Sequence, residues 1–331
     1  MQSKPNSSSS EVWVVAACYN ESPGIKEFIE AIERQKRWVK HLLLIDDGSH
    51  DGTASIISAI IDERRSKPEA IAISLVELTR NFGKEAAMLA GMDLARNNCD
   101  AVILIDADLQ HPPELINDMV KHWQAGAEMV TAVRSAQDQE SRLKIISASG
   151  FYSLFNRLTN SVKLVDGAGD FRLLSQPVVR ALTDMREVTR FSKALFPWTG
   201  FQSANISYDR PERNSGTSAW HPRRLVSYAL DGIFSFSVLP LRIWIAVGTF
   251  ISVVSLFYAV FLVIITLIHG IDVPGYASLI VAVLFLGGVQ LIGIGILGEY
   301  IGRIYEESKK RPPYLVRRIS TSASRLRQCD A

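Results

Sequence analysis

The sequence predicts an α/β domain with a mostly parallel sheet, followed by two membrane-spanning helices that form a hairpin. Apolar runs alternate with helical patterns over residues 11–220, which is typical of parallel strands that are covered on both faces. Two long runs without a charged residue follow at 243–268 and 276–298, and each is long enough to cross a bilayer. Polar and charged residues stand directly after successive apolar runs, where an α/β sheet binds its ligands.

Length, charge and cysteine usage exclude several classes of protein. The chain has 331 residues, enough for two domains, and its formal net charge of +2 gives no global basic field for nucleic acid. Three cysteines, Cys18, Cys99 and Cys329, lie far apart without C-x-x-C spacing. This argues against a disulfide framework or a zinc site and fits a reducing compartment. Residues 1–10 are polar, so we interpret them as a disordered leader and not as a secretory signal.

The elements of the α/β domain are predicted to follow one another as strand and helix. The predicted strands are 12–19, a run that begins at His41, 72–78, 101–108 and 128–134. Ser22 and Pro23 form a good N-cap and first-turn pair, so we expect the first helix to run from there to about Lys36. Two further helices are expected over 53–65 and from near Lys84.

Four successive strands end in polar side chains. The pairs are Asn20 and Glu21, Asp46 and Asp47, Arg80 and Asn81, and Asp106 and Asp108. Because ligands bind at the carboxyl ends of the strands in open α/β sheets, these residues are predicted to form one binding site. The sequence has no G-x-G-x-x-G motif after the first strand and no G-x-x-x-x-G-K-[ST] motif, so neither a dinucleotide fold nor a P-loop is supported.

Asp106 and Asp108 are predicted to hold a divalent metal ion. Two carboxylates this close repel each other unless a cation lies between them, and side chains two apart in an extended segment point to the same side. Hard oxygen ligands suit Mg²⁺ or Mn²⁺, which would also bind a nucleotide diphosphate. The alternative is that the aspartates cap the next helix, although two prolines delay it. Arg80 and Lys84 are placed to meet phosphates or, alternatively, are solvated charges.

The end of the second predicted strand is expected to bind another part of a nucleotide. Asp46 and Asp47 precede Gly48, which lets a backbone approach closely. A carboxylate there can accept hydrogen bonds from a base or a ribose. The alternative is an ordinary turn that is capped by Ser49 or Asp51, and both interpretations can hold together.

The two uncharged runs are predicted to cross the membrane with both of their outer ends in the cytoplasm. Basic residues stand before the first run and after the second, at Arg223, Arg224, Arg242, Arg303, Lys309, Lys310, Arg311, Arg317 and Arg318. The connecting loop has neither lysine nor arginine, so the positive-inside rule places the α/β domain and both termini in the cytoplasm. The alternative is a pair of buried helices in a soluble core, which rarely stay uncharged over such lengths.

The remaining segments complete the predicted domain organisation. Residues 221–242 mix arginines with large apolar side chains, so we expect interfacial amphipathic helices or, alternatively, a plain linker. The predicted order is a leader at 1–10, the α/β domain at 11–220, the interfacial segment at 221–242, the hairpin at 243–302 and a basic cytoplasmic tail at 303–331. Gly298 and Gly302 have the spacing of closely packed helices, within the hairpin or between protomers of a homo-oligomer.

Five motifs occur in an order that resembles family 2 glycosyltransferases with the GT-A fold. The motifs are CYNE, DDGSHDGT, RNFGKEAAMLAG, DADLQHPPE and GDFRL, and the resemblance covers roughly residues 11–310. Within the family the chain is most similar to polyprenyl-phosphate glycosyltransferases, of the dolichol-phosphate mannose synthase type and, nearer still, the bactoprenol glucosyltransferase type. The resemblance implies transfer of one sugar from a nucleotide donor to a polyprenyl phosphate, with inversion at the anomeric carbon.

The resemblance also implies roles for individual residues. It assigns the nucleoside to Tyr19, Glu21 and Asp47 with Asp46 adjacent, the metal and diphosphate to Asp106 and Asp108, and the sugar to Gln110. Asp170 falls where the family has an acidic residue proposed as the base, and Arg172 follows it. The acceptor phosphate is assigned to Arg190, Lys193, Arg213 and Ser218.

The sequence departs from the family pattern at two places. Ala17 and Cys18 stand where Pro-Thr is commoner, a mild change that keeps the strand. Ala219 stands where a long, usually basic, side chain is expected. If that position binds a phosphate of the acceptor or the donor, this chain is predicted to bind the phosphate more weakly.

The chemistry of the acceptor limits the expected role of Asp170. A phosphate monoester is largely ionised near pH 7, since its second pKa is about 6, so its oxygen can attack without losing a proton. We therefore expect cations to dominate catalysis. Asp170 would then orient the acceptor or an arginine and would not be an obligatory base.

Two other functions stay open from the sequence alone. A processive transferase that extends a polysaccharide tends to carry a Q-x-x-R-W motif and more spans, and neither is found here. An inactive transferase-like subunit is disfavoured by the intact strand-end residues but is kept open by Ala219. The donor is predicted to be UDP-glucose, with a modified arabinose or an N-acetylated sugar as alternatives.

Overall fold

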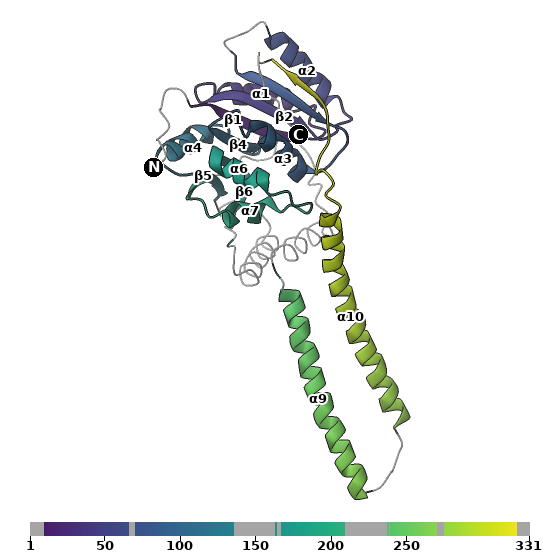
Figure 1. The fold of residues 1–331 in the computed structure, drawn as a ribbon. Helices are drawn as coiled ribbons and strands as arrows, with labels where there is room; N and C mark the ends of the chain where they lie inside the picture. Colours follow the sequence, from purple (N-terminus) through teal and green to yellow (C-terminus); the bar gives the residue numbers. More distant parts are fainter. Residues whose placement is uncertain are drawn as a thin grey trace. The chain divides into compact units, whose positions relative to one another are not determined.

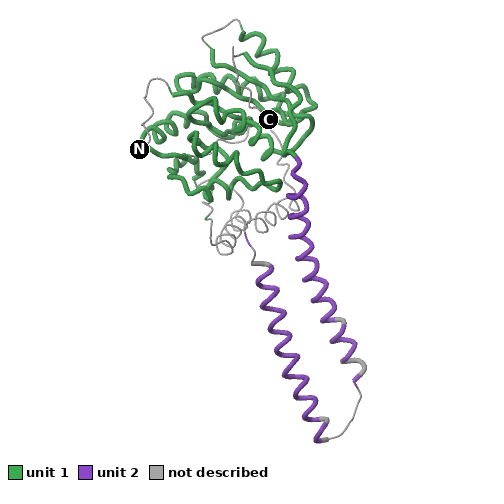
Figure 2. The backbone as a smooth tube through the Cα atoms, viewed as in Figure 1, with its two compact units in different colours: residues 1–225, 312–331 green, residues 226–311 purple. Residues whose placement is uncertain are grey.

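A computed structural model describes residues 10–65, 70–135, 163, 167–208, 237, 239–269 and 275–322. The chain divides into two units, which we describe separately (Figure 2). Unit 1 consists of residues 1–225 and 312–331, and unit 2 consists of residues 226–311. Both ends of unit 2 are therefore joined through the chain to unit 1.

Unit 1 contains an eight-stranded sheet (Figure 1). Its strands are β1 (Val12–Cys18), β2 (Val39–Asp46), β3 (Ala72–Leu78), β4 (Ala101–Asp106), β5 (Met129–Arg134), β6 (Ala168–Ser175), β7 (Ser203–Tyr208) and β8 (Val316–Thr321). Their order in the sheet is β7-β5-β6-β4-β1-β2-β3-β8. β6 and β8 run antiparallel to their neighbours, and all the other pairs are parallel. The predicted mostly parallel sheet is confirmed.

Helices connect the strands of unit 1. They are α1 (Ile25–Glu33), α2 (Thr53–Arg64), α3 (Lys84–Ala95), α4 (Leu115–Gln124), α6 (Gln176–Asp184) and α7 (Ser192–Trp198). The predicted N-cap at Ser22 is wrong, because a turn intervenes in which the amide of Ile25 donates to the carbonyl of Glu21 at 2.9 Å. The amide of Ser22 instead donates to Oδ2 of Asp51 at 2.9 Å, which ties this turn to the start of α2.

The inner strands β1 and β2 are buried on both faces, as their continuous apolar runs predict. Every residue of β1 except Ala17 is buried, and so is every residue of β2 except Lys40. α1 adds Phe28, which is fully buried. Burial of one large apolar side chain contributes about 1.5–3 kcal/mol to the free energy of folding. These strands therefore form a stable core, and the polar residues at their carboxyl ends are held in place by it.

Two antiparallel strands occupy positions that the sequence analysis does not predict. β6 lies between β4 and β5, and β8 lies at the edge beside β3. The segment 303–331 was expected to be a basic tail, but α10 continues into it as far as Ser308 and β8 forms further on. That part of the prediction is corrected. Arg318 of β8 donates a hydrogen bond to Glu77 of β3, which lies 241 positions earlier in the sequence. Local sequence patterns cannot predict a pairing across so large a sequence separation.

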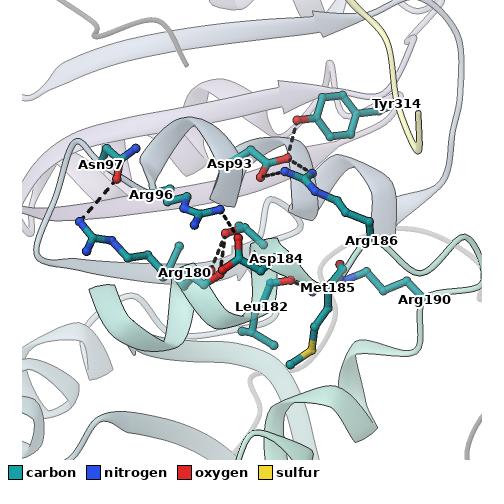
Figure 3. Close-up of polar contacts among 12 residues, drawn as sticks. Asp93, Arg96, Asn97, Arg180, Leu182, Asp184, Met185, Arg186, Arg190 and Tyr314 are labelled. Atoms are coloured by element: carbon teal, nitrogen blue, oxygen red, sulfur yellow. Dashed lines mark hydrogen bonds and ion pairs between the residues drawn. The ribbon is translucent and has the colours of Figure 1, made fainter. Parts of the chain in front are cut away.

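A buried carboxylate in α3 fastens the chain that leads into β8. Asp93 accepts hydrogen bonds from both terminal nitrogens of Arg186, at 2.6 and 2.9 Å, and from the hydroxyl of Tyr314 at 2.6 Å (Figure 3). Arg186 follows α6, and Tyr314 precedes β8. This Asp93 clasp therefore joins three segments that lie far apart in the sequence.

Unit 2 has two long apolar helices in its described part, α9 (Leu239–His269) and α10 (Tyr276–Ser308). Leu241–Ile265 and Leu279–Ser308 are long and apolar enough to cross a membrane, each with a mean hydropathy of 2.5. Their large apolar side chains are mostly exposed, as expected for helices that face lipid. The predicted pair of apolar helices is confirmed. α9 begins inside the segment predicted to be interfacial, of which residues 221–236 lie outside the described residues.

The glycines of α10 differ in what faces them. A Cβ atom added at Gly293 would lie 1.9 Å from Nε1 of Trp244 in α9, so a glycine is needed where these helices meet. Added Cβ atoms at Gly298 and Gly302 would meet nothing within 4 Å in the described part of the chain. Their packing against another protomer stays a prediction.

Candidate functional site

The carboxyl ends of β4, β1, β2 and β3 lie at one edge of the sheet, because these four strands are adjacent and parallel. The polar pairs noted in the sequence follow these ends. The antiparallel strand β6 adds another acidic residue. Leu104 of β4 pairs with Arg172 of β6, and continuing this register brings Asp170 beside Asp106. The edge therefore gathers carboxylates from separate strands.

Lys84, the first residue of α3, connects two of these carboxylates. Its Nζ lies 2.6 Å from Oδ1 of Asp106 and 2.5 Å from Oδ2 of Asp170. Burial lowers the pKa of Lys84, but the carboxylates of Asp170 and Asp106 raise it more, so the net pKa lies above its usual value. Lys84 is therefore a cation throughout the neutral pH range.

The same contacts keep both aspartates ionised. Burial raises the pKa of Asp106, but the neighbouring ring of His111 and the ammonium group of Lys84 lower it more, so the net pKa lies below the usual range. Burial also raises the pKa of Asp170, and Lys84 again outweighs it. Oδ1 of Asp170 is buried and accepts no hydrogen bond from the described residues. A buried anionic oxygen of this kind is costly unless a ligand supplies a cation or a donor.

Asp108 does not continue the strand that ends at Asp106. After β4 the chain turns through Leu109, which has a φ of +56°. The expectation that strand alternation directs both aspartates to the same side is therefore wrong. Oδ1 of Asp108 accepts the amide hydrogen of Gln110 at 3.1 Å. The turn leaves Asp108 exposed and Gln110 buried.

His111 is part of the site, although the sequence analysis gives it no role. Its Nε2 lies 3.7 Å from Oδ2 of Asp106, and its Nδ1 lies 2.7 Å from the hydroxyl oxygen of Tyr208 at the end of β7. The ring also packs against Phe171, with 5.4 Å between ring centroids. His111 therefore orients Asp106 and ties it to β7. Its place directly after the acidic turn is the signal that could have pointed to it.

Asp47 fastens the loop that precedes α3. Its Oδ1 accepts the amide hydrogen of Phe82 at 2.7 Å, and its Oδ2 accepts that of Gly83 at 2.9 Å. Gly48 has a φ of +74°, and a Cβ atom there would lie 2.7 Å from the carbonyl carbon of Arg80. The predicted close approach of backbone at Gly48 is confirmed. The ends of β2 and β3 are thus locked together.

The two aspartates at the end of β2 differ in what they can offer a ligand. Both carboxylate oxygens of Asp47 already accept hydrogen bonds from the chain, and burial raises its pKa despite them. Asp46 accepts only the amide hydrogen of Ser49, at 3.1 Å, through Oδ2, and its buried Oδ1 has no hydrogen-bond partner among the described residues. Asp46 therefore has an acceptor oxygen without a partner in the described part of the chain, whereas Asp47 does not. Asp51 accepts the amide and hydroxyl hydrogens of Thr53, so the alternative of a capped turn also holds.

The segment after β1 packs onto the segment after β2. The amide of Asn20 donates to Oγ of Ser49 at 2.9 Å, and its Oδ1 accepts the amide hydrogen of His50 at 2.9 Å. Asn20 has a φ of +56°, a conformation that asparagine tolerates better than most residues. Tyr19 is 44% exposed and Glu21 is partly buried, so both lie within reach of a ligand at this edge.

Two arginines of the predicted site have different surroundings. Arg80 is exposed, and its guanidinium group lies 4.0 Å from the centre of the Phe82 ring. Arg172 is buried, donates from Nε to the carbonyl of Gly169 at 3.0 Å and lies 4.3 Å from the centre of the Phe196 ring. Arg80 can therefore meet a phosphate. Arg172 packs β6 against α7 and supports the backbone next to Asp170.

Glu85, which the sequence analysis does not single out, holds the start of α7 against α3. Its carboxylate accepts a short hydrogen bond from the hydroxyl of Ser192 and another from the amide of Ser192 at 3.4 Å. Burial raises the pKa of Glu85 to about 7. Lys193 follows Ser192, and its charge contributes to the lowered pKa of Asp170. The contact therefore keeps Lys193 close to the site.

The residues predicted to bind an acceptor phosphate are only partly described. Arg190 is buried and donates to the carbonyls of Met185 at 2.8 Å and Leu182 at 3.1 Å (Figure 3 labels all three). Its guanidinium group is thus held by the chain, and its predicted contact with an acceptor phosphate stays a prediction. Arg213 and Ser218, together with Ala219, lie outside the described residues.

The residues at this edge fit a divalent cation that shares its coordination with a substrate. The donors are carboxylate oxygens, which suit Mg²⁺ or Mn²⁺, and the buried Oδ1 of Asp170 lacks a partner in the described part of the chain. No group of three or more His, Cys, Asp or Glu side chains among the described residues is arranged to hold a metal ion by itself. A metal ion bound by Asp106 and Asp108 would therefore need further oxygen ligands, such as those of a diphosphate.

Comparison with known proteins covers both units. Residues 13–183 match Glycosyl transferase family 2, and residues 239–304 match the GtrB C-terminal hairpin. The bactoprenol glucosyl transferase of Shigella phage SfV is 44% identical over 310 residues, which cover 93% of this chain and 98% of that one. The prophage bactoprenol glucosyl transferase homolog of Escherichia coli K12 is 42% identical over 312 residues, or 93% and 99% of the two chains.

A distant structural similarity accompanies these matches. Mannosyl-3-phosphoglycerate synthase from Rubrobacter xylanophilus shares 16% sequence identity and has a TM-score of 0.44, over 67% of this chain and 71% of that one. This similarity is too low to bear on function. The family match, in contrast, spans the strand-end residues, and the relatives span nearly the whole chain. The chain therefore belongs to glycosyl transferase family 2 and carries the GtrB C-terminal hairpin.

Proposed function

We propose that this protein is a membrane-bound inverting glycosyltransferase that moves glucose from UDP-glucose onto a polyprenyl phosphate such as undecaprenyl phosphate. The observation that carries the proposal is the similarity to proteins named bactoprenol glucosyl transferase over 93% of the chain. This similarity includes both the α/β domain and the apolar hairpin. A soluble donor and a lipid acceptor are therefore proposed together.

The strand ends would bind the donor. The nucleoside and sugar would meet Tyr19, Glu21, Asp46, Asp47 and Gln110, and the diphosphate would meet Arg80 and Lys84. The acceptor oxygen of Asp46 that has no partner among the described residues and the exposed guanidinium group of Arg80 support this assignment. Asp106 and Asp108 would hold Mg²⁺ or Mn²⁺, which when bound neutralises charge on the leaving diphosphate.

The reaction exchanges one phosphate oxygen for another at the anomeric carbon. An oxygen of the acceptor phosphate forms the new bond from the face opposite to the leaving group, which inverts the carbon. The bond to the β-phosphate oxygen of the donor breaks, and its electron pair leaves with UDP. No proton has to be removed, because the acceptor is already ionised. Lys193, with Arg213 and Ser218, would align the incoming phosphate, while Asp170 and Arg172 support the site.

The hairpin would hold the enzyme at the membrane with its catalytic unit in the cytoplasm. Both ends of unit 2 join unit 1, so two crossings return the chain to the side from which it left. The lysines and arginines that flank α9 and α10 favour the cytoplasmic side. We also propose a homo-oligomer, in which Gly298 and Gly302 would contact a second protomer.

The test is transfer of radiolabelled glucose from UDP-glucose to undecaprenyl phosphate by the full-length protein in detergent. Reactions contain Mg²⁺, Mn²⁺ or EDTA, and the label in the lipid phase is counted. We expect label in the lipid phase with either metal and at least a hundredfold less with EDTA, because the leaving diphosphate then keeps its full charge.

Three results would contradict parts of the proposal in different ways. Label in the lipid phase that is unaffected by EDTA would remove the metal from the mechanism. Transfer only from another sugar nucleotide would change the donor and keep the reaction. No lipid product with any sugar nucleotide, also in the variant Ala219→Lys, would favour an inactive transferase-like subunit.

A further inference from the structure

Lys84 occupies the carboxylate oxygens that a metal ion at Asp106 would need. Its Nζ lies 2.6 Å from Oδ1 and 2.9 Å from Oδ2 of Asp106, and 2.5 Å from Oδ2 of Asp170. The ammonium group thus contacts both oxygens of Asp106. Two cations on one carboxylate would repel each other strongly in a partly buried site. Asp106 is therefore expected to bind a divalent ion only weakly while Lys84 keeps this position.

We infer that Lys84 is a built-in counter-ion that leaves Asp106 when a nucleoside diphosphate and a divalent cation bind together. The inference rests on the proposed function, because it takes these two ligands from it. Before they bind, the ammonium group neutralises Asp106 and Asp170, which would otherwise repel each other. After they bind, the metal ion neutralises Asp106, and the diphosphate oxygens offer Lys84 a new partner.

The position of Lys84 permits this exchange. It is the first residue of α3, its side chain is 42% exposed, and its four-carbon stem can turn toward a ligand without any movement of the helix. The loop before it is held in place by Asp47, so the backbone of Lys84 stays fixed at the strand ends. The exchange therefore requires a change of side-chain rotamer only.

Exchange of partners makes the two ligands bind cooperatively. Metal alone must displace Lys84 from Asp106 and leave the ammonium group without that carboxylate. Metal together with the diphosphate replaces every charge contact that is broken. Because linkage is reciprocal, the nucleotide should strengthen metal binding by the same factor by which the metal strengthens nucleotide binding.

The test measures Mn²⁺ binding to the full-length protein in detergent, from loss of the electron paramagnetic resonance signal of free Mn²⁺, with and without saturating UDP. In the variant Lys84→Met we expect Mn²⁺ alone to bind about tenfold more tightly than in the wild type, since nothing has to be displaced. The factor by which UDP strengthens Mn²⁺ binding should fall by about the same amount.

The matched control is Lys121→Met, which removes a lysine charge on α4, where Nζ lies 2.9 Å from Oδ1 of Asp118. In this variant we expect the affinity for Mn²⁺ alone to change by less than about threefold. The reason is that displacement of Lys84 from Asp106, and not the overall charge of the protein, should determine this affinity. The variant Lys84→Gln keeps a polar side chain of similar length and should behave like Lys84→Met. Circular dichroism of each variant verifies folding.

The possible results separate the inference from the function on which it rests. Equal tightening of Mn²⁺ binding in Lys84→Met and Lys121→Met, or no tightening in either Lys84 variant, overturns the inference alone. Failure of the wild type to bind Mn²⁺ even with UDP overturns both the inference and the metal part of the proposed function. The predicted cooperativity in a protein that transfers no sugar would support the inference and contradict the enzymatic proposal.

Discussion

Asp170 has the properties of a fixed charge and not of a base that accepts a proton. Burial raises its pKa, but Lys84, whose Nζ lies 2.5 Å away, lowers it more, so the net pKa is below the usual range. A carboxylate with a low pKa is a weak base and stays ionised throughout the neutral range. The polyprenyl phosphate proposed as acceptor is already largely ionised near pH 7. Asp170 is therefore expected to act by holding Lys84 in place.

The variant Asp170→Asn tests this role. Loss of an essential general base reduces rates by about 10²–10⁴-fold, whereas loss of a charge that orients Lys84 should cost no more than about tenfold. For the wild type we expect a flat profile of turnover against pH from about 6.5 to 9, because Asp170 remains ionised there. Initial rates of lipid glucosylation measure both quantities.

Glu85 provides the control for this pH profile. Its pKa is raised by burial to about 7, so it loses its proton within the measured range. A step near pH 7 that disappears in the variant Glu85→Gln would come from the contact between Glu85 and Ser192. A rate that rises with a pKa well above 6 and persists in Glu85→Gln would contradict the assigned role of Asp170.

Among the secondary-structure elements, β8 connects the end of the hairpin to the edge of the sheet that we propose as the donor site. The carbonyl of Leu315 accepts the amide hydrogen of Thr79 at 2.9 Å, and Arg317 donates to the carbonyl of Thr79 at 2.8 Å. Thr79 is the residue before Arg80, at the carboxyl end of β3. The Asp93 clasp, with Tyr314, holds the same segment against α3 (Figure 3). This segment is therefore a structural part of the catalytic domain.

The variant Tyr314→Phe should destabilise the protein by about 1–2 kcal/mol, because a hydroxyl donor to a buried carboxylate is lost while the ring is kept. For a domain of this size that loss corresponds to a fall of about 3–6 °C in Tm. Thermal unfolding in detergent measures it. The matched control is Tyr258→Phe, at a site that is 61% exposed, which should leave Tm within about 1 °C. Equal shifts in both variants would contradict a role for the clasp.

The sequence predicts the elements whose signal is local and misses those that depend on distant pairing. β1 to β5 stand out as apolar runs, and Gly48 stands out because a positive φ and a close backbone favour glycine. β6 and β8 are antiparallel insertions, and no local pattern says which strands they join. The contact of Lys84 with Asp170 depends on β6, so it could not be predicted either.

The same limit applies to individual site residues. The position of Asp106 and Asp108 after an apolar run marks them as candidate site residues. The strand ends at Asp106, however, and the chain turns at Leu109, so the extended geometry expected for the pair is not present. Arg190 carries the charge expected of a phosphate ligand, and only the folded chain reveals the carbonyls to which it donates. Residue type therefore suggests the chemistry proposed for the site, whereas the direction of the side chains follows only from the folded chain.

In the whole molecule, the connectivity of the two units restricts how the chain can cross a membrane. Unit 1 contains the chain both before α9 and after α10. Two crossings satisfy this arrangement, and one crossing does not, because β8 has to reach the sheet that contains β3. If the flanking lysines and arginines lie in the cytoplasm, as we propose, the short connection between the helices is predicted to lie on the opposite side of the membrane.

Cysteine labelling tests this topology. In a Cys329→Ser background, a membrane-impermeant maleimide applied to intact cells should label Asp272→Cys, in the connection between the helices. It should label Ser308→Cys, at the end of α10, only after the membrane is permeabilised. Cys18 and Cys99 are buried and should react slowly in both cases. Labelling of Ser308→Cys in intact cells would contradict the cytoplasmic location of unit 1.

The place of β8 in the sheet also sets an order of events during synthesis. Seven strands leave the ribosome first, and β8 follows about a hundred residues later, after both apolar helices. β3 ends at Leu78 and β8 begins only at Val316, so at about 5–20 residues per second the free edge of β3 waits roughly 12–48 seconds for its last neighbour. An unpaired strand edge is where chains join wrongly to one another. The catalytic domain is therefore completed only once the hairpin has been made, so an enzyme that stalls before its membrane anchor remains unfinished at the donor site.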